Sequence, residues 1–147
     1  MLPIYVKHYA EPESFNRALG FAYDALVHGP VKFDAMATWK SLSERVSQGI
    51  YMGEGLLLPH TRVPGLPQPL FAFAVCPKGF TDIAVKQGQV PQYICLLLSP
   101  AESATCHTQF IAGIARKLLN PEWRAKALAA TTPEQLNALF EEKKTFS

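Results

Sequence analysis

The first third of the chain contains two stretches in which apolar residues recur every three or four positions, the spacing of one helix face. In the first, which follows Ser14, these residues are Phe15, Leu19, Ala22 and Leu26. In the second, which follows Asp34, they are Met36, Trp39, Leu42 and Val46. Gly29 and Pro30 stop the first stretch, and Gly49 stops the second. We therefore expect two amphipathic helices, the second with Asp34 as its N-cap.

The middle of the chain has a different pattern, with three short apolar runs bounded by glycine and proline. They cover residues 56–58, 70–76 and 93–98. Continuous rather than alternating hydrophobicity is typical of strands that are buried on both faces. Such strands need a covering layer on each side of their sheet. We therefore expect a central sheet between layers of helix.

The last third returns to helical spacing. Phe110, Ile111, Ile114 and Leu118 share one face, and the pattern stops at Asn120. Asn120 followed by Pro121 is typical of an N-cap and the first position of a new helix. The run from Thr132 to Gln135 predicts a capping box before a final helix. Helices at both ends around buried strands indicate one α/β domain that spans residues 1–147.

The composition excludes several functional classes. The chain of 147 residues is 48% apolar, with 18% charged residues and a net charge of +2, and its lysines and arginines are scattered. No nucleic-acid surface is therefore expected. No signal peptide opens the chain, and no run approaches ~18 uninterrupted apolar residues, so we expect a cytoplasmic protein without membrane insertion. Cys76, Cys95 and Cys106 form no CxxC pair and predict neither a disulfide framework nor a zinc site.

The first candidate for a functional residue is His60, which directly follows an apolar run. Pro59 cannot donate a hydrogen bond to a sheet, so we expect the strand to end there and a loop to present His60 at the edge of the core. An imidazole with a pKa of ~6.5 is largely neutral and nucleophilic near pH 7. This residue type therefore suits the transient carriage of a phosphoryl group.

A second histidine, His107, lies near the start of the helix that follows the last apolar run. It is expected to reach the same crevice as His60, because sites in open α/β sheets favour the carboxyl ends of strands. One ring then accepts phosphate and the other donates a hydrogen bond to it. Taken alone, a histidine after a strand is more often structural or merely exposed, which is how we interpret His8 and His28. A metal site with Cys106 is disfavoured, because zinc needs three or four convergent ligands.

The segment 53–62 combines Gly-x-Gly, three aliphatic residues, Pro-His and a basic residue. It resembles the phosphorylation motif of enzyme IIA domains of the bacterial phosphoenolpyruvate-dependent sugar phosphotransferase system, in the fructose, mannitol and nitrogen-regulatory class. Residues 93–100 resemble the strand before the family's second active-site histidine, which His107 matches. Residues 121–136 resemble the closing helices. The resemblance covers nearly the whole chain, and it implies a mixed sheet of about five strands sandwiched between helices.

The resemblance also implies a mechanism. His60 takes a phosphoryl group on Nε2 from a histidine-phosphorylated HPr-like carrier protein, and His107 orients or stabilises it. The expected recipient is a IIB component or a regulatory target protein, and no cofactor or metal is implied. The transition state spreads negative charge over the phosphoryl oxygens, so an arginine is expected nearby. Arg45 and Arg62 are the candidates.

The chain departs from the family pattern just before the motif. Members usually carry an Arg-Glu pair and a Ser-Thr-Gly-Ile-Gly run, where this chain has Glu44-Arg45 and Gly-Ile-Tyr-Met-Gly over residues 49–53. Tyr51 and Met52 are expected to narrow the crevice that Gly53 and Gly55 border. Two functions therefore stay open, a phosphoryl carrier and a non-catalytic regulatory module that binds proteins and keeps the fold.

Overall fold

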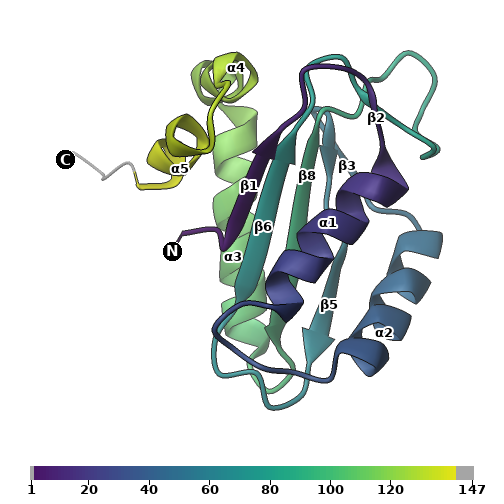
Figure 1. Ribbon diagram of the computed structural model, residues 1–147, viewed down its shortest axis with the longest axis vertical. Coiled ribbons are helices and arrows are strands. Elements are labelled where there is room, and N and C mark those ends of the chain that lie inside the picture. Colours follow the sequence, from purple (N-terminus) through teal and green to yellow (C-terminus); the bar gives the residue numbers. More distant parts are fainter. Residues whose placement is uncertain (1, 142–147) are drawn as a thin grey trace.

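The computed structural model describes residues 2–141, and its centre is a six-stranded mixed sheet (Figure 1). The strand order is β1-β6-β8-β4-β3, with β5 also paired to β8. These strands are β1 (Tyr5–His8), β3 (Tyr51–Gly53), β4 (Leu56–Leu57), β5 (His60–Val63), β6 (Leu70–Val75) and β8 (Tyr93–Pro100). A separate two-stranded sheet joins β2 (Glu13–Ser14) to β7 (Phe80–Thr81). The three apolar runs thus form β4, β6 and β8.

Strands β4 and β5 act as one interrupted strand. Both run parallel to β8 in a single register, with Leu57 opposite Ile94 and His60 opposite Leu97. The carbonyl of Pro59 accepts a hydrogen bond from the Leu97 N–H at 3.0 Å, so pairing continues through the break. The six strands therefore fill five positions in the sheet. The prediction that His60 lies in a loop is wrong, because backbone pairing with β8 resumes immediately after Pro59.

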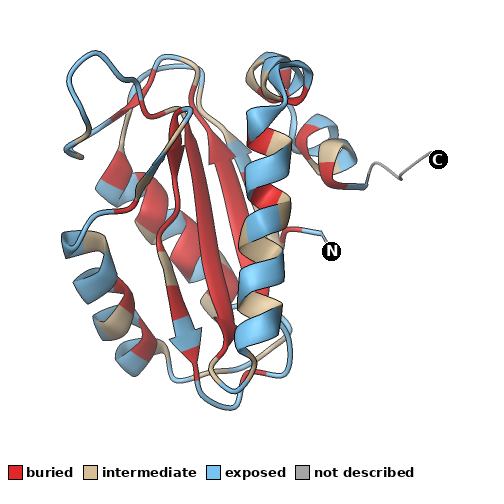
Figure 2. Ribbon diagram, turned by 180° about the vertical axis from the view of Figure 1, so that it is seen from behind, coloured by how far each residue is buried: buried red, intermediate tan, exposed pale blue. Residues whose placement is uncertain are grey.

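Helices cover both faces of this sheet (Figure 2). They are α1 (Phe15–Val27), α2 (Ala35–Ser47), α3 (Ala104–Leu119), α4 (Pro121–Ala129) and α5 (Pro133–Glu141). One core cluster joins the sheet to α1 and α2, and a second joins it to α3, α4 and α5. Every residue of β6 and β8 is buried between them. The expected α/β fold with a mixed sheet between helices is confirmed.

The helix starts follow the capping residues that the sequence indicates. A side-chain oxygen accepts a backbone N–H at 2.9 to 3.3 Å in each of four caps, which are Ser14, Asp34, Asn120 and Thr132. In the capping box at α5, the Gln135 side chain accepts the N–H of Thr131 at 2.7 Å rather than that of the N-cap Thr132. Between residues 2 and 141, no helix has both the length and the apolar character needed to cross a membrane.

The buried face of α2 matches the expected one only in part. Met36 is 86% exposed and Trp39 is 39% exposed, whereas Thr38 and Leu42 are buried. The reason is that α2 lies over the edge strand β5, where the hydroxyls of Ser41 and Thr61 are hydrogen-bonded at 2.5 Å. A helix that packs on a strand end carrying polar residues buries a mixed face. Hydrophobic spacing therefore placed Leu42 and Val46 correctly toward the core and Met36 and Trp39 wrongly.

Candidate functional site

The two histidines singled out in the sequence lie side by side in the fold. His60 begins β5, and His107 lies on α3, which follows the carboxyl end of β8. Their ring centroids are 5.4 Å apart with an angle of 41° between the ring planes. Both side chains are partly exposed. The pair thus lies between the carboxyl end of β4 and the start of β5, next to the carboxyl half of β8.

The His60 ring is fixed by a backbone carbonyl. Its Nδ1 lies 2.8 Å from the carbonyl oxygen of Leu58. Because a carbonyl can only accept, the hydrogen on this bond belongs to Nδ1. In the neutral ring, Nε2 then carries the lone pair. The Leu58 N–H donates to the Ile50 carbonyl at 2.9 Å, just before β3 starts at Tyr51. Beyond this bond, β3 no longer lies beside the strand that carries His60. The interruption at Pro59 therefore supplies the carbonyl that sets the tautomer of His60.

The His107 ring is held by Ser99. Its Nδ1 lies 2.6 Å from the hydroxyl oxygen of Ser99, a buried residue of β8. Partial burial lowers the pKa of His107, and the nearby charges of His60, Arg62 and Arg45 lower it further. His107 is therefore neutral near pH 7. No sequence signal marked Ser99 as functional, although it is a polar residue at the end of an otherwise apolar strand.

Two arginines border the histidine pair. Arg62 follows His60 by two residues on β5, so alternation along the strand places both side chains on one face. Arg45 lies on α2, which packs against β5. Both are exposed, and within residues 2–141 neither forms an ion pair. Because both charges lower the pKa of His107, both act on the space beside the rings. The site thus has positive charge available for an anion.

The residues expected to border the crevice have separate positions. Tyr51 points to the face of α1 and α2, and its hydroxyl accepts the Gly55 N–H at 3.0 Å. It therefore does not narrow the space between the histidines, contrary to expectation. Gly53 and Gly55 form the turn between β3 and β4 with positive φ angles of 94° and 81°. This turn lies at the end of β4 away from His60. Met52 has the opposite orientation to Tyr51 and is 55% exposed.

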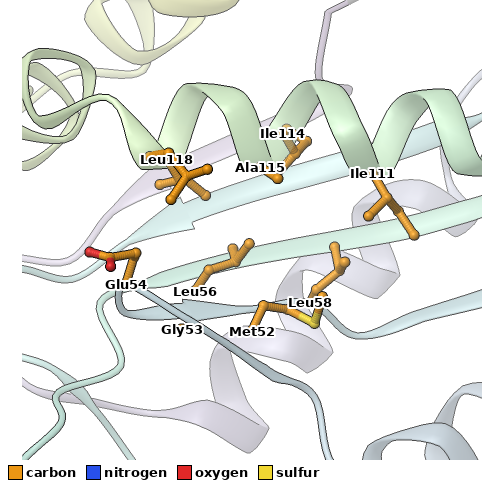
Figure 3. Close-up of a pocket in the computed structure, with 10 residues that line it drawn as sticks. Met52, Gly53, Glu54, Leu56, Leu58, Ile111, Ile114, Ala115 and Leu118 are labelled. Atoms are coloured by element: carbon orange, nitrogen blue, oxygen red, sulfur yellow. The ribbon is translucent and has the colours of Figure 1, made fainter.

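Met52 borders an apolar pocket of about 160 Å³ between α3 and the β3–β4 hairpin (Figure 3). Its walls include Leu56 and Leu58 from the sheet and Ile111, Ile114 and Leu118 from the helix. The ion pair between Glu54 and Arg124, at 3.3 Å, joins the hairpin to α4 at one end. Ile111 follows His107 by one helical turn, so the nearer end of the pocket lies one turn along α3 from His107. Its apolar walls exclude it as a phosphate site.

Residues 2–141 contain no group of three or more histidine, cysteine or acidic side chains placed to hold a metal ion. Cys106 is on α3 beside His107, and Cys76 and Cys95 are buried. The side chains described at the site are the two imidazoles, the Ser99 hydroxyl and the two guanidinium groups.

Comparisons with known proteins concern the chain as a whole. The family model described as "Phosphoenolpyruvate-dependent sugar phosphotransferase system, EIIA 2" matches residues 4–143. The 2-O-alpha-mannosyl-D-glycerate-specific EIIABC component of Escherichia coli is 29% identical over 93 residues, which are 63% of this chain and 14% of that protein. The chain thus spans a small part of that relative's length.

Two solved structures share the fold. The nitrogen regulatory protein IIA-Ntr of Neisseria meningitidis has a TM-score of 0.75 and 21% identity, with 92% of each chain covered. Enzyme IIA mannitol of Escherichia coli, solved in complex with phosphorylated enzyme IIB mannitol, has a TM-score of 0.72 and 14% identity, with 94% of each chain covered. At these identities, the likeness concerns the fold alone.

Proposed function

Because this chain belongs to the EIIA 2 family of the phosphoenolpyruvate-dependent sugar phosphotransferase system, we propose that it is a phosphoryl carrier whose acceptor atom is Nε2 of His60. The observation that carries this assignment is the hydrogen bond from His60 Nδ1 to the Leu58 carbonyl. It leaves the lone pair on the nitrogen that is free to attack. The ring is partly exposed and is anchored on a strand, so a partner protein can reach it.

The transfer step is an exchange of one P–N bond for another. The lone pair of His60 Nε2 forms the new bond to phosphorus as the bond to the donor's histidine breaks, and the donor ring keeps that electron pair. A protonated donor ring then leaves as neutral imidazole. His60 becomes a positive ring with hydrogen on Nδ1 and phosphoryl on Nε2. The carbonyl of Leu58 stabilises this positive ring, because its oxygen accepts the Nδ1 hydrogen at 2.8 Å.

The surrounding groups have electrostatic roles in this proposal. His107 donates a hydrogen bond to a phosphoryl oxygen, and Arg62 and Arg45 offset the charge of the phosphoryl group. His107 also lies near the N-terminal end of α3, where the helix dipole favours negative charge. The rate then depends mainly on positioning, because the transition state is loose and needs little covalent assistance.

We assign the partners by the family's chemistry. The donor is a histidine-phosphorylated HPr-like protein, and the recipient is a IIB component or a regulatory target protein. Support for a IIB recipient comes from the similar IIA mannitol, which was solved with phosphorylated IIB mannitol. Support for regulation comes from the similar nitrogen regulatory protein. A cytoplasmic location agrees with the three free cysteines, Cys76, Cys95 and Cys106.

The test is a transfer assay with phosphoenolpyruvate, enzyme I and HPr. We expect acid-labile phosphate on the wild-type protein, none on His60→Ala, and weakened transfer to His107→Ala. His28→Ala is the matched control, because His28 lies at the end of α1 and is exposed. Failure of the wild-type protein to accept phosphate from any donor would contradict the proposal. Intact partner binding by His60→Ala in that case would favour the non-catalytic module.

A further inference from the structure

We propose that Ser99 is a positioning residue that holds His107 in the tautomer with its single ring proton on Nε2. The inference deepens the proposed function, on which it rests, by assigning the hydrogen-bond donor that faces the phosphoryl group. A phosphoryl group has only acceptor oxygens, so a neutral histidine assists it only through an N–H. The tautomer of His107 therefore decides whether this ring attracts or repels the group on His60.

Ser99 is placed to make this contact by the strand that carries it. It lies opposite Arg62 in the pairing of β5 with β8, two residues beyond the Leu97 that faces His60. The residue is 0% exposed, and its hydroxyl oxygen is 2.6 Å from His107 Nδ1. The helix that bears His107 starts at Ala104, a few residues after β8 ends. The connection between the strand and the helix is thus short enough to fix both groups relative to each other.

The direction of this hydrogen bond follows from the hydrogen-bond partners of the Ser99 hydroxyl. Within residues 2–141, His107 Nδ1 is the one hydrogen-bond partner of the Ser99 hydroxyl. If Nδ1 carried the proton, Ser99 would accept it, and the buried hydroxyl hydrogen would have no acceptor. If Nδ1 carries the lone pair, the hydroxyl donates, and no polar hydrogen is left unsatisfied. The second arrangement is therefore favoured, and it places the ring proton on Nε2.

The two rings then have opposite tautomers. His60 holds its hydrogen on Nδ1, against the Leu58 carbonyl, and has a lone pair on Nε2. His107 has its lone pair on Nδ1, against the Ser99 hydroxyl, and a hydrogen on Nε2. One ring is thus prepared as a nucleophile and the other as a donor. Partial burial lowers the pKa of His107, which keeps this ring neutral near pH 7. A neutral ring has a single proton, so its position on Nδ1 or Nε2 can be measured.

Nitrogen NMR of the unphosphorylated protein measures both tautomers directly. With ¹⁵N-labelled protein at pH 7.5, we expect the proton of His60 on Nδ1 and that of His107 on Nε2. In Ser99→Ala, we expect His107 to populate both tautomers while His60 is unchanged. Phosphoryl transfer to this variant should fall about tenfold, the effect of one lost hydrogen bond. Ser99→Thr keeps the hydroxyl and should restore the Nε2 proton.

Ser41→Ala is the matched control. It also removes a hydrogen-bonded hydroxyl, but one that contacts Thr61 rather than a histidine. The His107 tautomer should be unchanged in this variant. A wild-type His107 with its proton on Nδ1, or an unaltered tautomer in Ser99→Ala, would overturn the inference. Normal phosphate acceptance together with the Nδ1 proton overturns this inference alone. Absence of phosphate acceptance with both tautomers as expected overturns the proposed function instead.

Discussion

The interrupted strand has two halves that follow β8 in one register but meet different surroundings. In the β4 half, Leu56 and Leu57 are buried, and β3 covers the outer edge. In the β5 half, the described part of the chain adds no strand to the outer edge, so His60 is partly exposed and Arg62 is exposed. The same backbone pairing thus supports a buried core at one end and the partly exposed candidate site at the other.

The difference arises at Leu58 and Pro59. Leu58 makes the last hydrogen bond on the covered side, from its N–H to Ile50. Its carbonyl is then used by the imidazole of His60 rather than by a neighbouring strand. A continuous three-stranded ladder would pair this carbonyl with backbone. Because β3 starts only at Tyr51, it leaves the edge of β5 exposed. The Leu58 carbonyl at this point also orients the His60 ring.

The largest expected contrast is between Leu57→Ala in the covered half and His60→Ala in the open half. Leu57 is 0% exposed, so its truncation leaves a cavity and should lower the free energy of unfolding by about 2–5 kcal/mol. His60→Ala should change it by less than about 1 kcal/mol but abolish phosphate acceptance. Urea unfolding and the transfer assay measure the two quantities. Equal destabilisation by both variants would contradict the separation of the two halves.

Arg62→Ala should have the next largest effect, on transfer rather than on stability. Loss of a charge-assisted contact to the phosphoryl group is expected to slow transfer by roughly ten- to a hundredfold. Arg62→Lys should restore part of the rate, because it keeps the charge without the planar fork. Arg17→Ala, an exposed arginine on α1, is the control. Transfer that is equally fast in Arg62→Ala and in the control would remove Arg62 from the site.

Thr61→Val tests the opposite face of β5. Thr61 is buried, and its hydroxyl is bonded to that of Ser41 on α2. The nearly isosteric substitution should lower the free energy of unfolding by about 1 kcal/mol through loss of this bond. Transfer should stay close to the wild-type rate, because the side chain points away from the histidine pair. A loss of transfer as large as that of Arg62→Ala would show that the two faces are coupled.

The smallest expected effect is the pH dependence contributed by His107. Its pKa in the folded protein is lower than its usual value of ~6.5 in an unfolded chain. As the pH falls through ~6.5, the unfolded chain therefore binds this proton first, and stability decreases. His107→Asn should remove this part of the decrease between pH 7.5 and pH 5.5 in thermal unfolding. An NMR titration that places the His107 pKa above 6.5 would contradict the sign.

Much of the fold follows from the sequence because the relevant signals are local. Capping residues such as Ser14 and Asp34 mark helix starts through contacts made within a single turn. Long apolar runs mark β6 and β8 because these strands are buried on both faces. Strands β1, β3 and β5 carry no such signal. They are short and partly polar, and they exist through backbone pairing with distant residues.

The site was predictable to a lesser degree. His60 and His107 stand out through the motifs that surround them, and the structure places their rings 5.4 Å apart. The Leu58 carbonyl cannot be recognised in a sequence, because every residue has one. Ser99 is similarly inconspicuous, since its partner is set by the packing of α3. The orientation of Tyr51 depends on strand register, which explains why its expected position in the crevice was wrong.

The central claim is that Nε2 of His60 takes the phosphoryl group because the Leu58 carbonyl occupies Nδ1. Phosphorus and nitrogen NMR of the ¹⁵N-labelled, phosphorylated protein identifies the bonded nitrogen directly. We expect a single phosphorus–nitrogen coupling, to Nε2 of His60, with hydrogen retained on Nδ1. Phosphorus bonded to Nδ1 of His60, or to either nitrogen of His107, would contradict the account.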